Sequence, residues 1–252
     1  MEWIAAQLVR FGISFAIWYA GGLLVSKKGV KVNYTRKINH FSLMFIPFFM
    51  DMIHTSSGTS NGSEDNFLLS AMGLLSGLLF MLLFVKPIRE RVGVINTAFL
   101  SVDRPEDRPF TLTWLTTQTA ASFLVAIPLT GYLMSINKME LIFIIILING
   151  FGDGLAEPIG IRFGKHKYET RALFTDRKYT RSIEGSACVF ITGLLAVILF
   201  SSSFSTNQFI VALLAIPILM TLAEAFSPHS WDNAFLFLVG EILLFLILEI
   251  VI

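Results

Sequence analysis

The sequence has few charged residues. Asp, Glu, Lys and Arg make up 15% of its 252 positions, against about 25% in a typical soluble domain. Its single cysteine, Cys188, cannot form an internal disulfide, so a disulfide-stabilised secreted scaffold is excluded. Hydrophobic residues make up 54% of the chain and include 24 phenylalanines. So few charges cannot cover so much apolar surface in water, which excludes a cytosolic globular enzyme and predicts a lipid bilayer environment.

Apolar runs long enough to cross a membrane recur along the whole chain. A helix needs about 20 apolar residues to span the hydrocarbon core, and backbone groups inside lipid must bond within the protein, which favours helices. Eight candidate spans follow: Trp3–Val25, Phe41–Ile53, Phe67–Val85, Trp114–Met134, Met139–Phe163, Ile183–Phe204, Asn207–Phe226 and Asn233–Ile252. The second is short, and glycines and a proline interrupt the fifth. We therefore expect an all-α, polytopic bundle of about eight transmembrane helices (seven to nine) that forms a single domain over residues 1–252.

Basic residues are concentrated in alternate loops between these spans. The loops after the first, third and fifth spans hold nearly all of the 19 lysines and arginines, and the loops between them hold almost none. Positively charged loops remain on the cytoplasmic side of a membrane. This pattern predicts an integral, multi-pass membrane protein whose two termini lie on the opposite side.

The richest polar stretch lies in the fifth span, at Asn149–Lys167. Ionisable residues inside a membrane are costly and are therefore candidates for function, and Asp153 and Glu157 share one face of a helix. Because Pro158 disfavours helical geometry at Glu157, we expect the helix to break there and to line a polar cavity. Small residues recur every four positions, which is typical of close helix packing but does not account for the acids: Gly152, Ala156, Gly160 and Gly164.

A basic cluster follows the acids directly. It consists of Arg162, Lys165, His166 and Lys167. Part of it is ordinary cytoplasmic loop charge. However, carboxylates that can hold Mg²⁺ beside donors that can hold phosphate oxygens are the pairing that phosphoryl transfer needs. Gly164 would let the backbone approach a phosphate closely. Neither a Walker A loop nor a G-x-G-x-x-G motif is present in this stretch.

The sixth span opens with the sequence Arg181–Ser186. Ser182 is a good helix cap, and Glu184 suits the positive end of a helix. The same helix end, with Gly185 and Ser186 in its first turn and Arg181 beside it, would also attract an anion. Both interpretations, a cap and an anion site, remain open.

A third cluster joins the last two spans at Glu224, Asp232 and Asn233. The predicted topology places this turn on the cytoplasmic side, together with Asp153. Asp232 alone would be typical of a helix cap. Separate motifs that converge on one face favour a site over scattered polar residues.

Two further positions are less specific. Glu241 lies deeper in the last span, where it is protonated, paired with another helix, or near the substrate. His40 begins the second span just after Arg36 and Lys37. A lone histidine there is usually interfacial, but its predicted position leaves it able to join the site.

These motifs, in this order, resemble the CTP-dependent lipid-alcohol kinases: dolichol kinase, phytol kinase and the yeast-type diacylglycerol kinase. The resemblance covers Arg36–His40, Gly152–Lys167, Ser182–Ser186 and Ala223–Asn233, so the motif-bearing catalytic half is about 139–252. Two departures stand out: Arg181 replaces a lysine that is usual in the family, and Glu157–Pro158 replaces a more variable pair. Arginine keeps the charge but presents a planar fork of donors, so donor or substrate preference can differ.

The resemblance implies transfer of the γ-phosphate of CTP to the hydroxyl of a lipid alcohol; the choice of CTP is not readable from the residues themselves. No residue discriminates among phytol, polyprenol and diglyceride acceptors, and we expect an isoprenoid alcohol because the chain is compact. The implied partners are the nucleotide, the lipid alcohol and the bilayer, and nucleic acid is not among them. On this hypothesis the catalytic residues are Asp153, Glu157 and His166, one of which accepts the hydroxyl proton. Mg²⁺ or another divalent cation is held by Asp153, Glu224 and Asp232.

The remaining residues of the hypothesis bind the nucleotide or surround it. The nucleotide and phosphate-binding residues are Gly152, Arg162, Gly164, Lys165, Lys167, Arg181, Ser182, Glu184, Gly185 and Ser186. Possible further site residues are Arg36, Lys37, His40, Glu224, Asp232 and Asn233.

Three other classes share part of this pattern. A phosphatidate cytidylyltransferase also uses CTP, Mg²⁺ and a lipid, but it releases pyrophosphate where a kinase leaves CDP. A transporter with a broken helix explains acids inside the membrane, but it predicts repeat symmetry and charges spread through the depth of the bundle. The CDP-alcohol phosphotransferases share an Asp-Gly start, but their following Ala-Arg and further aspartates are missing after Asp153.

Overall fold

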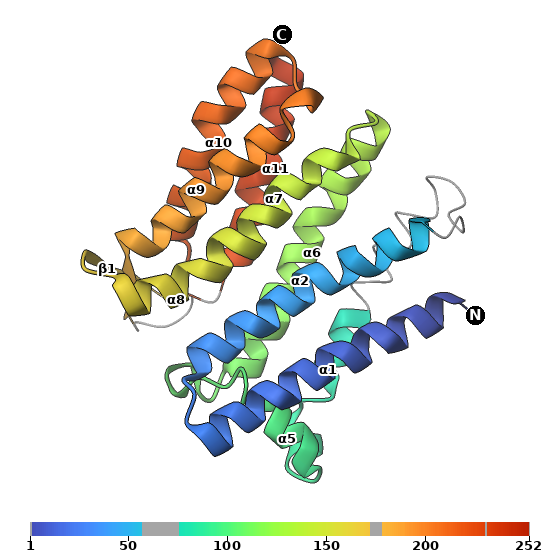
Figure 1. Cartoon of the computed structure of the whole chain (residues 1–252), viewed down its shortest axis with the longest axis vertical. Helices are drawn as coiled ribbons and strands as arrows, with labels where there is room; N and C mark the ends of the chain where they lie inside the picture. Colours follow the sequence, from blue (N-terminus) through green and yellow to red (C-terminus); the bar gives the residue numbers. More distant parts are fainter. Residues whose placement is uncertain (1, 57–75, 172–177, 230, 252) are drawn as a thin grey trace. The chain divides into compact units, whose positions relative to one another are not determined.

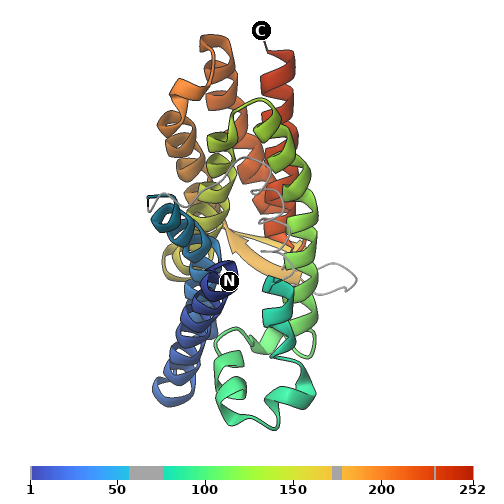
Figure 2. The ribbon, with the colours of Figure 1, turned by 90° about the vertical axis from the view of Figure 1, so that its right-hand side faces the viewer.

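The computed structural model describes residues 2–56, 76–171, 178–229 and 231–251. Most of these residues are helical, as Figure 1 and Figure 2 show. They form two compact units, Met1–Thr117 and Gln118–Ile252. The predicted helical architecture is confirmed, whereas organisation as a single domain stays a prediction.

The first unit is built from helices around an aromatic core. Its elements are α1 (Glu2–Lys28), α2 (Val32–Ser56), α4 (Lys86–Arg89), α5 (Gly93–Phe99), the 3-10 turn η1 (Pro105–Asp107) and the start of α6 (Thr111–Ser135). The rings of Trp18, Phe80 and Phe84 are in contact and at most 3% exposed. A Cβ atom at Gly22 would lie 1.7 Å from the Thr97 carbonyl oxygen. Glycine is therefore required where α1 crosses α5.

The second unit carries most of the predicted motifs. After α6 it contains η2 (Met139–Leu141), α7 (Ile142–Leu147), the π-helical turn η3 (Ile148–Asp153), α8 (Gly154–Phe163), β1 (Lys167–Arg171), β2 (Lys178–Ser182), α9 (Ile183–Leu199), η4 (Ser201–Ser203), α10 (Thr206–Phe226) and α11 (Asp232–Ile250). Helix α9 packs against α8, η3 and α10, and α10 packs against α11. The strands form an antiparallel hairpin in which Lys167 pairs with Ser182. This register places the hairpin between the end of α8 and the start of α9.

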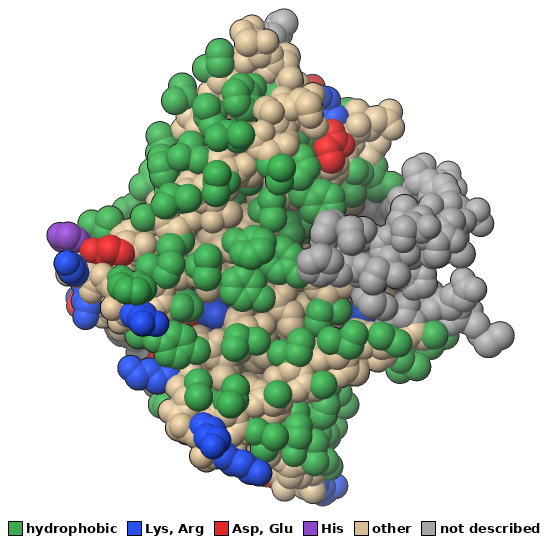
Figure 3. All heavy atoms as spheres, viewed as in Figure 1, with side chains coloured by type: hydrophobic (Ala, Val, Ile, Leu, Met, Phe, Trp, Pro, Cys, Tyr) green, Lys and Arg blue, Asp and Glu red, His purple; other side chains and the backbone are tan. Residues whose placement is uncertain are grey.

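Five helical segments are long and apolar enough to cross a membrane. They are Gln7–Lys28, Thr111–Ser135, Met139–Phe163, Thr206–Phe226 and Asp232–Ile250, and Ile183–Leu199 is a shorter apolar helix. Hydrophobic side chains cover much of the visible surface in Figure 3, and Leu195, Leu199 and Leu214 are each more than 60% exposed. So much exposed apolar surface suits a bilayer. The multi-pass membrane character is therefore supported, while the number of eight spans stays a prediction.

The second and third predicted spans are not among these five segments. Predicted span Phe41–Ile53 lies within α2, which starts earlier, at Val32, and takes Arg36, Lys37 and His40 into the helix. Predicted span Phe67–Val85 falls partly on residues 57–75, outside the described residues. Neither span is therefore established by length and hydropathy among the described residues.

Two details of the second unit differ from the sequence prediction. The predicted break at Glu157–Pro158 is wrong, since α8 continues without interruption through Pro158. The irregularity lies just before it, where Ile148–Asp153 form a π-helical turn. Glycines have a low helix propensity and occur at positions 150, 152 and 154, and π-helical turns are frequent at functional sites. The irregular element therefore ends at Asp153 and lies before the proline.

The second difference is the hairpin. An all-α fold with a basic loop was predicted, but Lys167–Arg171 and Lys178–Ser182 pair as strands. The side chains of Tyr168 and Thr170 are less exposed than those of their neighbours, which is the two-residue period of a strand. The lysines and arginines of these strands were interpreted as the charge of a cytoplasmic loop, so the short strand alternation was not recognised.

Candidate functional site

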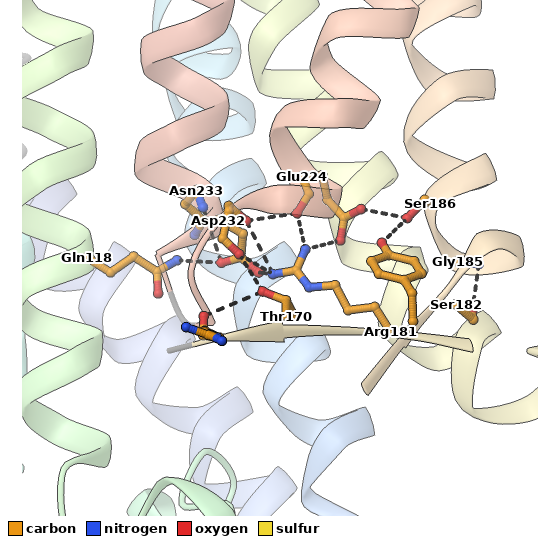
Figure 4. Close-up of polar contacts among 12 residues, drawn as sticks. Gln118, Thr170, Arg181, Ser182, Gly185, Ser186, Glu224, Asp232 and Asn233 are labelled. Carbon is orange, nitrogen blue, oxygen red and sulfur yellow. Dashed lines mark hydrogen bonds and ion pairs between the residues drawn. The ribbon is translucent and has the colours of Figure 1, made fainter. Parts of the chain in front are cut away.

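The site forms where the hairpin meets the ends of the helices of the second unit. Arg181 on β2 extends its guanidinium to the end of α10 (Figure 4). Its Nη1 donates to the carboxylate Oε1 and to the backbone carbonyl of Glu224. Its Nη2 donates to the Ser227 Oγ at 3.2 Å and forms an ion pair with Asp232 Oδ2 at 3.8 Å. One arginine therefore binds both α10 and the first turn of α11.

Asp153 adds a third carboxylate to this cluster. It belongs to the π-helical turn, is 3% exposed, and interacts electrostatically with Arg181 and Glu224. Asp153, Glu224 and Asp232 therefore surround a single guanidinium, and the cluster is negative when all four groups are ionised. A net negative charge in a buried cluster is unfavourable. This arrangement can attract a cation.

A chain of hydroxyl groups continues from the cluster into the hairpin. Ser186 Oγ donates to Glu224 Oε2 at 2.9 Å, and the Tyr168 hydroxyl lies 2.7 Å from the same Ser186 oxygen. Burial, together with the negative charge of Glu224, raises the pKa of the Tyr168 phenol above its ordinary value. The phenol is therefore a neutral hydrogen-bond donor over the physiological pH range.

Two side-chain amides and one backbone amide donate hydrogen bonds at the Asp232 end of the site. Gln118 on α6 donates to Asp232 Oδ1 at 3.4 Å, and the backbone amide of Asn233 donates to the same oxygen at 3.2 Å. Asn149, just before Asp153 in the chain, donates to the Asn233 carbonyl at 3.3 Å. These contacts tie the first turn of α11 to α6 and to the π-helical turn.

The glycines of the predicted stripe pack closely against the start of α9. A Cβ atom at Gly160 or at Gly164 would lie 2.8 Å from the Ser182 hydroxyl oxygen, and one at Gly185 would lie 2.6 Å from the Ala156 carbonyl oxygen. The Ser182 hydroxyl accepts from the Gly185 amide at 3.1 Å, so it caps α9. Close packing and capping therefore explain these residues, and their role in phosphate binding stays a prediction.

The basic cluster lies at the surface near the hairpin. His166 Nδ1 is 2.9 Å from Glu184 Oε1, and the His166 backbone amide is 3.3 Å from both oxygens of that carboxylate. The side chains of Arg162, Lys165 and Lys167 are exposed. Glu184 thus fixes His166 at the helix start, outside the buried carboxylate cluster. The role of His166 as a proton acceptor stays a prediction.

The structure therefore brings together Asp153, Arg181, Ser186, Glu224 and Asp232, and keeps the basic cluster and Glu184 at the surface. Glu157 is half-buried on α8. Arg36, Lys37 and His40 belong to the first unit, so their part in the site stays a prediction. Thr170 on β1 also contributes, because its hydroxyl donates to the Ser227 carbonyl at 3.0 Å. The sequence interpretation missed Gln118, Tyr168, Thr170 and Ser227. A glutamine inside a predicted membrane span was the one signal that could have indicated a member of this set.

The chemistry of the donor set fits magnesium only in part. Carboxylate oxygens are the ligands that Mg²⁺ prefers. Within the described residues, however, no group of three or more His, Cys, Asp or Glu side chains has the arrangement of a metal site, and Arg181 already lies among the acids. Mg²⁺ is commonly held by one or two carboxylates together with substrate phosphates. The residues therefore fit a metal that arrives with a polyphosphate better than a cage made of protein ligands.

The fold and the site together define a multi-pass helical membrane protein with a buried acidic cluster at the end of its spans. Comparison with models of protein families, with curated proteins and with solved structures finds no match. The function must therefore be inferred from the residues and their geometry.

Proposed function

We propose that this chain is a membrane-embedded kinase that transfers the γ-phosphate of CTP to the hydroxyl of a lipid alcohol. The acceptor that we favour is an isoprenoid alcohol. The observation that carries the proposal is a buried cluster in which Arg181 pairs with Glu224 at the end of α10 and with Asp232 at the start of α11. Asp153, in the π-helical turn, also interacts electrostatically with Arg181. Exposed basic residues of the same unit lie nearby in the chain. CTP itself, and the class of acceptor, come from the resemblance in the motifs.

The location suits two substrates of opposite solubility. A nucleotide triphosphate approaches from water, whereas the alcohol is dissolved in the bilayer, so transfer must occur where the spans end. Arg162, Lys165 and Lys167 are exposed there and would hold phosphate oxygens. Asp153 and Asp232 would bind the metal that accompanies the triphosphate. When bound, Mg²⁺ neutralises charge on the phosphoryl group.

The reaction itself requires little covalent participation by the protein. The alcohol oxygen forms a bond to the γ-phosphorus, and the bond from that phosphorus to the bridging oxygen breaks, so that CDP leaves with the electron pair. A carboxylate of the cluster accepts the hydroxyl proton. Asp153 is our candidate, because it is 3% exposed and belongs to the π-helical turn, an element frequent at functional sites.

The test uses the purified full chain in lipid nanodiscs. Labelled CTP, ATP, GTP and UTP are each offered with phytol, a polyprenol and a diglyceride, with and without Mg²⁺. Formation of CDP and a phosphorylated alcohol supports the proposal. Release of pyrophosphate with a nucleotide-linked lipid from phosphatidate would instead identify a cytidylyltransferase, and the absence of nucleotide turnover under all these conditions would overturn the enzymatic proposal.

A further inference from the structure

A cavity lies between α6 and α11 of the second unit, away from the acidic cluster. Its volume is about 250 Å³, and its lining residues are Leu129, Tyr132, Glu241, Ile242, Phe245 and Leu246. Both walls are helices long and apolar enough to cross a membrane. The cavity is therefore placed at the depth of the hydrocarbon core and not at the aqueous surface.

Polar contacts at two levels tie the two walls of this cavity together. Gln118 on α6 bonds Asp232 on α11 at 3.4 Å, at the candidate site. Further along both helices, the Tyr132 hydroxyl donates to Glu249 at 2.6 Å. Residue numbers rise together on both helices, so α6 and α11 run parallel. The cavity therefore lies along the same two helices that meet at Asp232.

The size and lining of the cavity limit what can occupy it. Leu129, Ile242, Phe245 and Leu246 supply hydrocarbon surface, while the Tyr132 hydroxyl already has a partner, Glu249, on α11. A volume of about 250 Å³ is below the roughly 300–1,000 Å³ of pockets that enclose a drug-sized ligand. It suits a segment of one hydrocarbon chain better than a whole lipid.

We infer that this cavity binds the hydrocarbon tail of the lipid-alcohol substrate, an inference that rests on the proposed function. At 1.5 Å per helical residue, Glu241 lies about 14 Å and Leu246 about 21 Å along α11 from Asp232. A substrate whose hydroxyl reaches the acidic cluster places its tail at this depth. The cavity therefore selects for alcohols whose chains are long enough to extend past Glu241, and short-chain alcohols lose this contact.

The direct test is photo-crosslinking on the full chain in nanodiscs, without nucleotide. The probe is an isoprenoid alcohol that carries a photoreactive group near the end of its tail. Labelling is expected in the peptides that contain Leu129–Tyr132 and Ile242–Leu246, and an excess of the same unlabelled alcohol should remove it. Labelling spread evenly over the lipid-facing helices, or removed equally well by the same excess of phospholipid, would overturn the inference.

A blocking substitution adds a second test. Leu246→Trp fills the cavity and should reduce specific labelling roughly tenfold or more. Leu214→Trp is the matched control, because Leu214 is a 63% exposed residue of α10 that does not line the cavity. Unchanged labelling in a folded Leu246→Trp protein would contradict the inference. If that variant does not fold, the labelled positions in the unsubstituted chain decide.

The two proposals fail in different ways. Because labelling requires no turnover, cavity labelling without formation of CDP and a phosphorylated alcohol would refute the kinase and leave the tail site in place. Conversely, kinase activity with labelling elsewhere would refute the tail site alone.

Discussion

The guanidinium of Arg181 on β2 pairs with Glu224 on α10 through both the carboxylate and the backbone carbonyl. Both side chains are largely buried, at 13% and 5% exposure. Burial alone would lower the pKa of Arg181, but the charges of Glu224 and Asp232 outweigh it, so that the pKa is raised. The arginine is therefore always charged and fastens the hairpin to the helix ends that carry two of the three carboxylates.

Removing this arginine should destabilise the protein strongly. Arg181→Met leaves the Glu224 carboxylate buried without its partner, which typically costs about 3–5 kcal/mol in free energy of unfolding. A double variant with Glu224→Gln should recover only part of the loss, because Glu224 is then uncharged while Asp232 still lacks its ion pair with Arg181. Denaturant unfolding in detergent measures both effects.

The same hairpin offers a matched control. Lys178 and Glu169 form an ion pair at 2.8 Å, but both are more than half exposed. Exposed pairs contribute about 0–1 kcal/mol, so Lys178→Met should change stability little. Equal losses in Arg181→Met and Lys178→Met would show that burial of the Arg181 pair has no energetic importance.

The glycines facing Ser182 give a second prediction. In Gly160→Ala, the added Cβ would lie 2.8 Å from the Ser182 hydroxyl oxygen, and such overpacking typically costs about 1–3 kcal/mol. Adding Ser182→Ala removes that oxygen and should relieve the clash, although it also removes the helix cap, at about 1 kcal/mol. Unfolding temperatures of the single and double variants measure this coupling.

Two other glycines serve as controls. Gly164→Ala should not be relieved by Ser182→Ala, since its Cβ would also lie 2.3 Å from the Gly160 carbonyl oxygen. At Gly131, where a Cβ meets nothing within 4 Å, alanine should be neutral or stabilising, because it has the higher helix propensity. Equal responses at all three positions would contradict the packing explanation.

The sequence predicts the convergence of the acids better than their bonding. Topology alone places Asp153, Glu224 and Asp232 on one face, and the structure brings them together. The sequence also marked Arg181, but as a phosphate ligand, because a partner 43 positions away leaves no trace in local spacing. The hairpin was hidden for a related reason: its lysines and arginines are the same residues that signal a cytoplasmic loop.

Tyr168 should titrate above the ordinary tyrosine value of 10.0, because burial and the Glu224 charge raise its pKa. The folded state then holds the phenolic proton more tightly than the unfolded state. Stability is therefore unaffected below that ordinary value and falls as the pH rises through the raised pKa. The phenolate absorbance of the protein minus that of Tyr168→Phe isolates this titration.

The Glu224→Gln substitution checks the cause of this shift. It removes the contribution of the Glu224 charge but not that of burial, so the Tyr168 pKa should fall only partly toward its ordinary value. A phenol that titrates at or below that value in the unsubstituted chain would contradict the buried hydroxyl chain from Tyr168 to Glu224.

If the kinase proposal holds, Asp153→Asn should lower turnover of labelled CTP roughly a hundredfold or more, as expected for loss of a proton acceptor or metal ligand. The substitution preserves shape, so the protein should stay folded and extractable. Glu140→Gln is the control, because Glu140 begins the same span about 20 Å from Asp153 along the helix. Full turnover in Asp153→Asn would refute the assignment.

The predicted orientation can be tested by labelling single cysteines in a Cys188→Ser background. Lys165 and Ser202 are exposed residues. Lys165 lies just before the hairpin that leads into α9, and Ser202 lies just after the other end of α9. Helix α9 has 17 residues, which is just enough to cross the hydrocarbon core. A membrane-impermeant maleimide applied to intact cells should label Ser202→Cys directly and Lys165→Cys only after permeabilisation. The opposite pattern would place the acidic cluster on the outer side, away from cytoplasmic nucleotide, and would remove the physical basis of the kinase proposal.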